Sequence, residues 1–541
     1  MPTTTSLQEL DESSGTPEQH PKLLGLGAVL PLRIAGVLAL LIAGCGAGGT
    51  PIITPTPIPS SPTVTLSAAD VEAIVQAALT SVSPTTMVVA VVDRAGNPLA
   101  LWRKPDAPAM AAGNFSMPID TNDLALGLAR TGAFFSNNQA PLTSRTVRFI
   151  SGIHLPPGVM NQPNADLYGI ENTNRGCKLS AELEVSGLLP STAFKTGIGP
   201  GIITGKADTN DSDPNAVNPG GLPIFKGTVL VGGIGVAGVI PDVAEFAAFT
   251  GAQANGYGPV PNPLPSPGAV FLGGVVLPAI DQTTRPASVG PGTSVGSYLM
   301  GPIDGKPAPE GDLVGPHPSV SPDPANGGLT SAEVKQILDN AEATANTTRA
   351  AIRLPLGSRT RMVIAVSDLD GTLIGLRRMP DATVFSVDVA ATKARNMAYF
   401  NGTQRTMADL DQVPLGTAVT NRTISFGAMP LFPPGIDGSQ QGPFFDLYLN
   451  DTKNPCSQGL GGGLSSGNNS GIVFFPGSTG LFRNGVLVAG LGVSGDGVDQ
   501  DDYVTSGGAT GFQAPTNIRA DQIFIRNVRL PYFKFPRDPT N

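Results

Sequence analysis

The feature that most constrains the fold of this chain is an internal repeat, in which one series of segments occurs twice in the same order. Each copy opens with Ser or Thr three residues before an acidic residue and with apolar residues at helical spacing, in LSAADVEAI (66–74) and LTSAEVKQI (329–337). This pattern predicts a capped amphipathic helix. The later matches pair VVAVVDRAGNPLALWRKPDA (88–107) with VIAVSDLDGTLIGLRRMPDA (363–382), LPPGV (155–159) with FPPGI (432–436), GLPIFKGTVLVGGIGVAG (221–238) with GLFRNGVLVAGLGVSG (480–495), and AVFLGGVVLP (269–278) with QIFIRNVRLP (522–531). We therefore expect two homologous domains.

The repeat also sets the expected domain boundaries. These are an export signal at 1–45, a Pro/Thr-rich tether at 46–65, a first domain at 66–280, a Pro/Gly-rich linker at 281–328 and a second domain at 329–541. Each domain carries an insertion that contains PPG, DLY and a Cys, at about 156–219 and about 433–477. Insertions of that length in a compact domain usually have a function or are disordered, and the shared DLY favours ordered loops or added strands.

The N-terminal segment has the features of an export signal. Arg33 precedes the apolar run Ile34–Ile42, which is shorter than the ~20 residues needed to span a bilayer. The run ends in LIAGC, which resembles a bacterial lipobox with Cys45 as the acylated residue. The alternative is a plain secretory signal with a chance Cys. We expect a protein of the bacterial cell envelope, lipid-anchored to a membrane and facing the periplasm or the exterior.

Composition excludes several classes of function. The formal net charge is −9, and no Lys/Arg-rich run is present, which argues against a nucleic-acid partner. The chain has only three His, at positions 20, 154 and 317, so most zinc sites are excluded.

The stretch VIAVSDLDGTLI (363–374) resembles the nucleophile motif of haloacid dehalogenase-type phosphatases, in which the first Asp attacks phosphorus. The first copy keeps Asp93 in the place of Asp368, but it has Ala95 in the place of Asp370. Both copies share a strand, an Asp, a Gly and a second strand, which predicts a β-hairpin whose Gly has positive φ. We therefore interpret the motif as a turn and keep the phosphatase as a minor alternative.

The second copy resembles the GlcG/HbpS family of haem-binding, haem-degrading-type domains. VLVAGLGVSGDGVDQDD (486–502) is similar to the family's glycine-rich strand and the acidic start of its last helix. RMPDA (378–382) is similar to the family's RMDGA, and Lys393-Ala394 to its KA. The first copy lacks a counterpart of the acidic start of the last helix, and it lacks a counterpart of Lys393. The resemblance covers about half of each copy and implies an α/β (α+β) fold of two profilin-like domains, each an antiparallel sheet flanked by helices, with long inserted loops.

The resemblance implies that haem or another small hydrophobic ligand is the partner. We expect a binding protein rather than an enzyme, since haem-degrading activity has only the family likeness in its favour and no catalytic residue is identified. Arg377, Arg378 and Lys393 are candidates for pairing with the propionates, and Met379 for a soft axial ligand. The alternatives are a solvated hairpin end for the arginines and core packing for Met379. A structural or interaction protein that keeps the fold without a ligand is the alternative function.

Asp496, Asp499 and Asp501, with Asp502, offer oxygen ligands for a cation such as Ca²⁺, although they lack the spacing of an EF-hand loop. A structural role at a helix N-terminus is the preferred interpretation.

Cys177 and Cys456 follow the two DLY segments at matching places. If the two domains pack as an internal pseudo-dimer, these cysteines can meet across its axis. An exported chain would then keep a Cys177–Cys456 disulfide. The alternative is two buried free thiols.

Overall fold

The computed structural model describes residues 64–153, 167–185, 201–213, 215–264, 270–322 and 326–540, all within one compact unit, Ser61–Asn541. The predicted export signal with Cys45, the tether as far as residue 63, and His20 and His154 lie outside these residues. In the described part of the chain, no helix has both the length and the apolar character that crossing a membrane requires. Below, "first half" means residues 66–280 and "second half" means residues 329–541.

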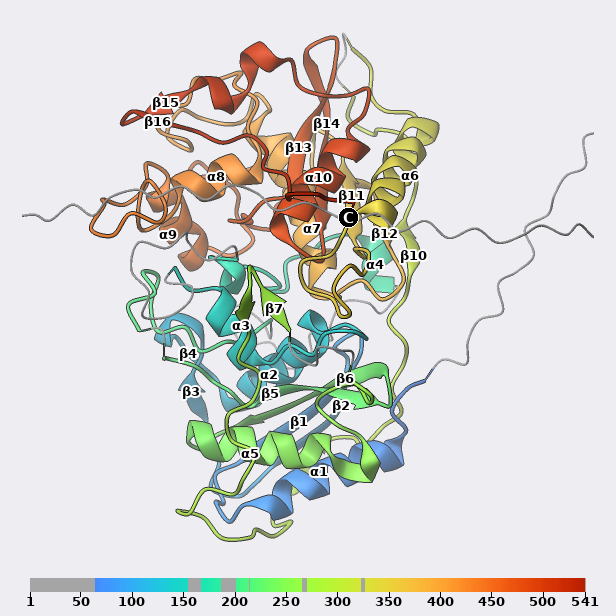
Figure 1. Ribbon diagram of the computed structural model, residues 1–541, viewed down its shortest axis with the longest axis vertical. Coiled ribbons are helices and arrows are strands. Elements are labelled where there is room, and N and C mark those ends of the chain that lie inside the picture. The colour runs from blue at the N-terminus through green and yellow to red at the C-terminus, as the bar shows by residue number, and fades with distance from the viewer. Residues whose placement is uncertain are drawn as a thin grey trace, which may run out of the picture. The chain divides into compact units, whose positions relative to one another are not determined.

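The first half contains an antiparallel sheet built on two hairpins (Figure 1). Its strand order is β5-β6-β1-β2-β9. The bounds are β1 Val88–Asp93, β2 Pro98–Arg103, β5 Gly221–Lys226, β6 Val229–Ala237 and β9 Ser297–Met300. The buried runs VVAVVD and PLALWR form the central hairpin, with Val89 opposite Trp102.

The second half repeats this arrangement. Its strand order is β13-β14-β11-β12-β10, and neighbouring strands are again antiparallel. The bounds are β10 Gly311–Val314, β11 Val363–Ser367, β12 Leu373–Arg378, β13 Ser478–Arg483 and β14 Val486–Ser494. The edge strands β9 and β10 both come from the segment 281–328, so the predicted linker completes a sheet in each half.

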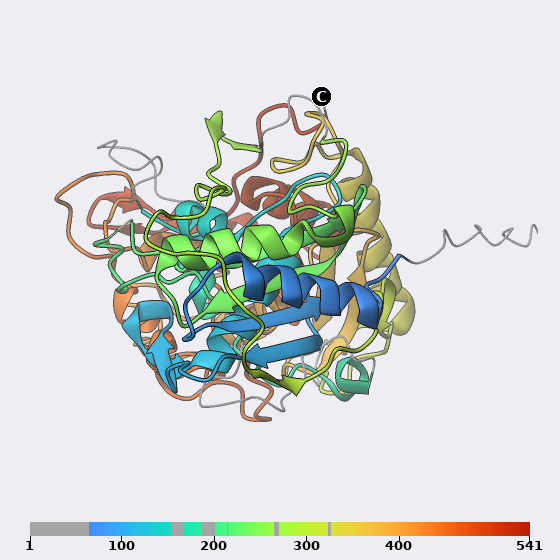
Figure 2. The ribbon, with the colours of Figure 1, turned by 90° about the horizontal axis from the view of Figure 1, so that it is seen from below.

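Helices cover both faces of each sheet, which confirms the predicted α/β class of antiparallel sheets flanked by helices. In the first half, α1 (Ala68–Ser81) and α5 (Pro241–Ala252) lie side by side on one face, and α2 (Thr121–Phe135) lies on the other (Figures 1 and 2). In the second half, α6 (Ser331–Thr347) and α10 (Val498–Gly508) pack together, and α7 (Phe385–Phe400) packs on β14 and β11. The capping boxes predicted for the first helices are present, at Ser67 and Thr330.

The remaining described elements are short. They include the helices α3 Ser144–Ile150, α4 Ala181–Val185, α8 Asn421–Gly427 and α9 Phe445–Lys453, and the two-stranded hairpins β3–β4 (Met110–Ala112, Pro118–Asp120), β7–β8 (Phe271–Leu272, Val275–Val276) and β15–β16 (Phe524–Ile525, Val528–Arg529). The second insertion was expected to form loops or strands, and it instead contains α9, in which the DLY segment is helical.

The helices α2 and α7 join the two halves. All sixteen residues of α7 are buried, and Asn122 alone in α2 is not. Phe135 at the end of α2 stacks on Phe385 at the start of α7, with ring centroids 4.2 Å apart. A helix buried on all sides must be covered by more than its own sheet, and one hydrophobic cluster accordingly contains side chains from both halves.

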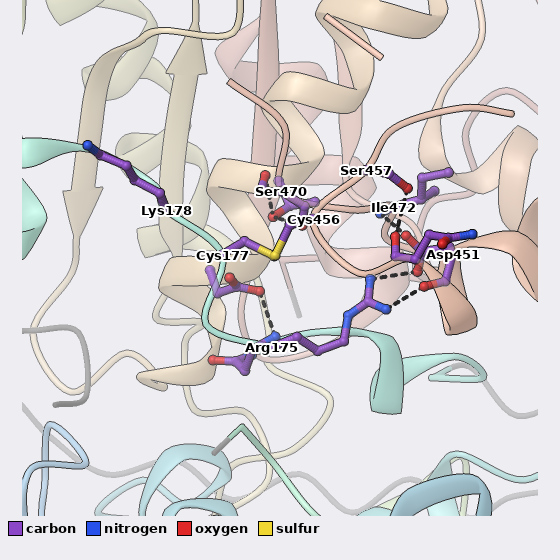
Figure 3. The surroundings of a disulfide bond; sticks show 12 residues. Arg175, Cys177, Lys178, Asp451, Cys456, Ser457, Ser470 and Ile472 are labelled. Atoms are coloured by element: carbon purple, nitrogen blue, oxygen red, sulfur yellow. Dashed lines mark hydrogen bonds and ion pairs between the residues drawn. A yellow bond between two sulfur atoms is a disulfide. The ribbon is translucent and has the colours of Figure 1, made fainter. Parts of the chain in front are cut away.

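Polar bonds and a disulfide also cross between the halves. Figure 3 shows Cys177 and Cys456 joined, with Cα atoms 5.3 Å apart, beside the buried Arg175–Asp451 ion pair. The Arg175 Nη2–Asp451 Oδ2 distance is 2.8 Å, and Asn174 N donates to Asp388 Oδ2 at 2.8 Å. These contacts hold a segment of the first insertion against α7 and α9.

Asp368 lies in the turn of the β11–β12 hairpin, as the turn interpretation of its motif predicts. Its strand is antiparallel to both neighbours and leads into another strand, whereas a phosphatase of the resembled type needs a parallel strand that leads into a helix. The Asp368 carboxylate accepts hydrogen bonds from the backbone N–H groups of Leu369, Val320 and Ser321. Asp93 likewise bonds its own turn and Lys306 N. Each Asp therefore ties a hairpin to the 281–328 segment.

Substitution of Gly371 tests how far the stability of this hairpin depends on close packing. Gly371 and Gly416 have the same φ of +83°, but a Cβ at Gly371 would lie 2.5 Å from Leu464 Cδ1, while a Cβ at Gly416 would meet no atom within 4 Å. Gly416→Ala should cost about 1–2 kcal/mol of backbone strain. Gly371→Ala should cost about 1–3 kcal/mol more, because it adds an overpacking term. Thermal unfolding of both variants measures the difference, and equal losses of stability would exclude a packing role for Gly371.

Candidate functional site

A cavity of about 640 Å³ lies where the two halves meet. We call it the central cavity. The first half contributes Phe135, Leu142, Ile150, Leu167 and the β7–β8 turn (271–274). The second half contributes residues from five places: the segment 349–357, the start of α7 (Thr383, Phe385), Phe475, the β14–α10 connection (494–501) and Pro536–Arg537. The volume lies within the ~300–1,000 Å³ of small-molecule sites.

Burial distinguishes the floor of the central cavity from its rim. Phe385, Phe475 and Ile150 are each at most 5% exposed, so the floor is apolar and aromatic. At the rim, Arg349 is partly exposed and Arg537 is exposed, and Arg349 Nη2 donates to the Arg537 carbonyl at 3.2 Å. The site therefore combines an apolar interior with two cations at its opening.

One ion pair lies at the floor. Lys393 Nζ, from α7, donates to Asp501 Oδ2 at 3.1 Å and to the Val493 carbonyl at 2.7 Å, and it lies 5.1 Å from the centroid of the Phe475 ring. Asp501 is among the lining residues and is 2% exposed. Burial raises the pKa of Asp501 to about 7, against the opposing effect of Lys393, and burial lowers the pKa of Lys393. The other carboxylate oxygen, Asp501 Oδ1, is buried and accepts no hydrogen bond from the part of the chain that the structure describes.

The other acidic residues of this region form ion pairs with arginine and lysine side chains, and Asp499 and Asp502 share Arg422. Asp496 pairs with Arg353, and Asp502 with Arg422. Asp499 pairs with Arg422 at 2.7 Å and with Lys534 at 2.8 Å. Within the described ranges, no group of three or more His, Cys, Asp or Glu side chains is placed to hold a metal ion. The predicted cluster is therefore a set of individual ion pairs around the start of α10.

A second cavity, also of about 640 Å³, lies in the first half. We call it the first-half cavity. It is lined by the segment before β5 (218–220), the end of β6, the start of α5, and Leu124 and Leu128 of α2. The central cavity uses the same places of the second half, namely Phe475 before β13, the end of β14 and the start of α10. No charged side chain lines the first-half cavity.

Backbone contacts align the two sites residue by residue. A Cβ on Gly235 or on Gly492 would meet the carbonyl of Ala125 or of Ala390, respectively. One helical turn further along α2 and α7, a Cβ on Gly233 or on Gly490 would meet the carbonyl of Ala129 or of Ala394, respectively.

Side-chain bonds give the same alignment. Arg130 Nε donates to the Gly96 carbonyl at 2.9 Å, and Arg395 Nε to the Gly371 carbonyl at 2.8 Å. Leu128 therefore occupies the position in the first half that is equivalent to Lys393 in the second half. Ala244 is likewise equivalent to Asp501. An apolar pair in one cavity replaces the ion pair in the other.

The hairpin residues proposed from the sequence do not line the central cavity. Arg377 makes ion pairs with Asp312, Asp339 and Glu342. Arg378 is buried and donates to the carbonyls of Pro309 and Ala382.

Met379 is 1% exposed, and its sulfur accepts from Met362 N at 3.3 Å. His317 pairs with Glu182 on the surface. Core packing, the alternative expected for Met379, describes its place. The solvated hairpin end expected for the arginines is wrong, because the Arg377 and Arg378 side chains are only 12% and 1% exposed and bond to other groups of the protein.

No pattern in the sequence indicated that Arg349, Arg537 and the aromatic residues of the floor line one cavity. The two arginines stand in unremarkable polar segments far apart in the chain, and the floor residues look like ordinary core positions.

The ion pair can be tested with a double-mutant cycle. Asp501→Ala alone leaves the buried Lys393 ammonium without its carboxylate and should cost about 3–5 kcal/mol. Lys393→Leu combined with Asp501→Ala copies the first half and removes both charges. The double variant should therefore be at least about 2 kcal/mol more stable than Asp501→Ala in denaturant unfolding. Strictly additive effects of the two single substitutions would refute the coupling.

Comparison with known proteins identifies the second half. Residues 329–510 match the family described as "Haem degrading protein HbpS-like". No curated protein matches the chain. Among solved structures, a PduOC complex with haem has 22% identity and a TM-score of 0.23, over 35% of this chain and 98% of that one. Protein ORFY of Klebsiella pneumoniae has 20% identity and a TM-score of 0.22, over 35% of this chain and 92% of that one. The family match confirms the resemblance inferred from residues 486–502: the second half contains a GlcG/HbpS-like domain.

Proposed function

We propose that this chain is an exported, lipid-anchored protein that binds haem or a related tetrapyrrole in the central cavity. The observation that carries the proposal is a cavity of about 640 Å³ with an apolar floor and Arg349 and Arg537 at its rim. A porphyrin needs an apolar slot and cations for its two propionates, and these residues offer both. The family of the second half supports the same ligand class.

The lining residues fit the ring and the carboxylates of a porphyrin better than they fit its iron. None of the described residues that line the cavity is His, Cys, Met or Tyr, which are the usual axial ligands of haem. Binding would therefore depend on apolar contact and on the rim arginines. We propose a carrier or sensor role, with no catalytic step assigned to any residue.

We further propose that the halves are copies of one domain that act as an internal pseudo-dimer, and that the central cavity depends on both. Side chains of both halves line it, and the Phe135–Phe385 stack is part of its wall.

The rim arginines can be tested by titration with haemin. Arg349→Gln combined with Arg537→Gln should weaken haemin binding about two- to thirtyfold, because each exposed ionic contact contributes roughly 0.2–1 kcal/mol. The Soret band measures the affinity. Arg526→Gln with Arg529→Gln is the matched control, since both residues are exposed and neither lines the cavity. Loss of affinity in the control variant, or no loss of affinity in the rim variant, would show that the haemin propionates do not bind at Arg349 and Arg537. A wild-type chain that gives no Soret shift would favour a structural or interaction role.

The lipid anchor has a separate test. A bacterial host that expresses the full chain should incorporate labelled fatty acid into the wild type and not into Cys45→Ala, because acylation requires the Cys45 thiol. After membrane fractionation, the Cys45→Ala protein should be in the soluble fraction and the wild type in the membrane fraction. Equal labelling of the two proteins would show that LIAGC is not a lipobox.

A further inference from the structure

Asp501 leaves one buried hydrogen-bond acceptor unused at the floor of the central cavity. Its Oδ2 accepts from Lys393 Nζ at 3.1 Å, while Oδ1 accepts from no described residue. The residue is 2% exposed and lines the cavity. A buried polar atom without a partner normally costs ~1–3 kcal/mol, so a native site that keeps one usually has another use for it.

The first-half cavity shows that the fold does not need this pair. Leu128 and Ala244 occupy the equivalent positions there, in a cavity of the same volume with no charged lining residue. A buried ion pair is often no more stabilising than apolar residues of similar volume. Packing alone therefore does not account for a carboxylate with a free oxygen at this place.

The surrounding charges define what Oδ1 can bind. Arg353, Arg422 and Lys534 are each bonded to Asp496, Asp499 or Asp502, and Lys393 is bonded to Oδ2. Oδ1 is thus a buried acceptor without a bonded donor, on a residue that lines the cavity, and it suits an N–H or O–H donor carried by the ligand. An anionic group would be repelled from the floor and would go to the arginines at the rim.

We propose that Asp501 Oδ1 accepts hydrogen bonds from the pyrrole N–H groups of a linear tetrapyrrole, so that the central cavity prefers this ligand to a closed metal complex. The inference rests on the proposed tetrapyrrole function and specifies its ligand class. In haem the four nitrogens hold iron and carry no hydrogen. In an open-chain tetrapyrrole the N–H groups turn toward one acceptor, while the two carboxylates reach Arg349 and Arg537. Hydrogen bonds to a charged acceptor in a buried site are the stronger kind.

The test compares two ligands on two proteins. Biliverdin and haemin have similar apolar surfaces and the same two propionates, but only biliverdin offers pyrrole N–H donors. The wild type should bind biliverdin more tightly than haemin. Lys393→Leu with Asp501→Ala should weaken biliverdin binding about tenfold or more and should change haemin binding by less than about twofold. Absorbance titration gives both affinities, and circular dichroism checks that the variant is folded.

Two further variants keep the result decisive. Lys393→Met with Asp501→Leu removes both charges and the acceptor without shrinking either side chain to alanine, and it should give the same selective loss if the leucine–alanine variant does not fold. Asp521→Asn is the control, because Asp521 is an aspartate of the second half that does not line the cavity. It should leave both affinities unchanged.

The outcomes separate this inference from the proposed function. Equal losses for both ligands, or a wild type that binds haemin and not biliverdin, would overturn the role of Asp501 and leave tetrapyrrole binding intact. A wild type that binds neither ligand would overturn both.

Discussion

The structure depends on the burial of two helices, α2 and α7, between the sheets of the two halves. Each helix has its own sheet on one side and packs with the other half on another, so neither has a face in water. A buried Phe contributes ~1.5–3 kcal/mol relative to an exposed one, and the Phe135–Phe385 stack places two of them at the junction. Separating the halves would expose this surface, which explains why the described residues form one compact unit.

Burial on all sides imposes a second condition, because charged residues on these helices need partners inside the protein. Arg130 and Arg395 each donate to the carbonyl of a hairpin glycine, and Arg395 also donates to the Leu179 carbonyl of the other half. Asp388 accepts from Asn174 N, and burial raises its pKa to about 6. These bonds satisfy groups whose burial would otherwise cost several kcal/mol each. They also fix the position of the first insertion on α7.

The two cavities show how one framework supports two kinds of interior. Both lie where the first turn of the last helix meets the end of the long strand, and both measure about 640 Å³. In the first half no charged side chain lines this place. In the second half Lys393 and Asp501 bring a charge pair to it, and α2 of the first half closes it with Phe135. The family match, residues 329–510, lies in this second half, which is the half that holds the ion pair.

Local patterns were sufficient for the sequence alone to predict the repeated order of elements, the capping boxes, the β11–β12 hairpin with Gly371 and the likeness of residues 486–502 to the GlcG/HbpS family. Those features depend on residues close together in the chain, whose spacing directly reflects helical or strand periodicity. The tertiary structure alone decided that 281–328 supplies an edge strand to each sheet, and that Arg349 and Arg537 meet at one rim. It also decided that Arg377 and Arg378 are bonded outside the cavity. The proximity of such distant residues follows from how α2 and α7 pack, and no local pattern encodes that packing.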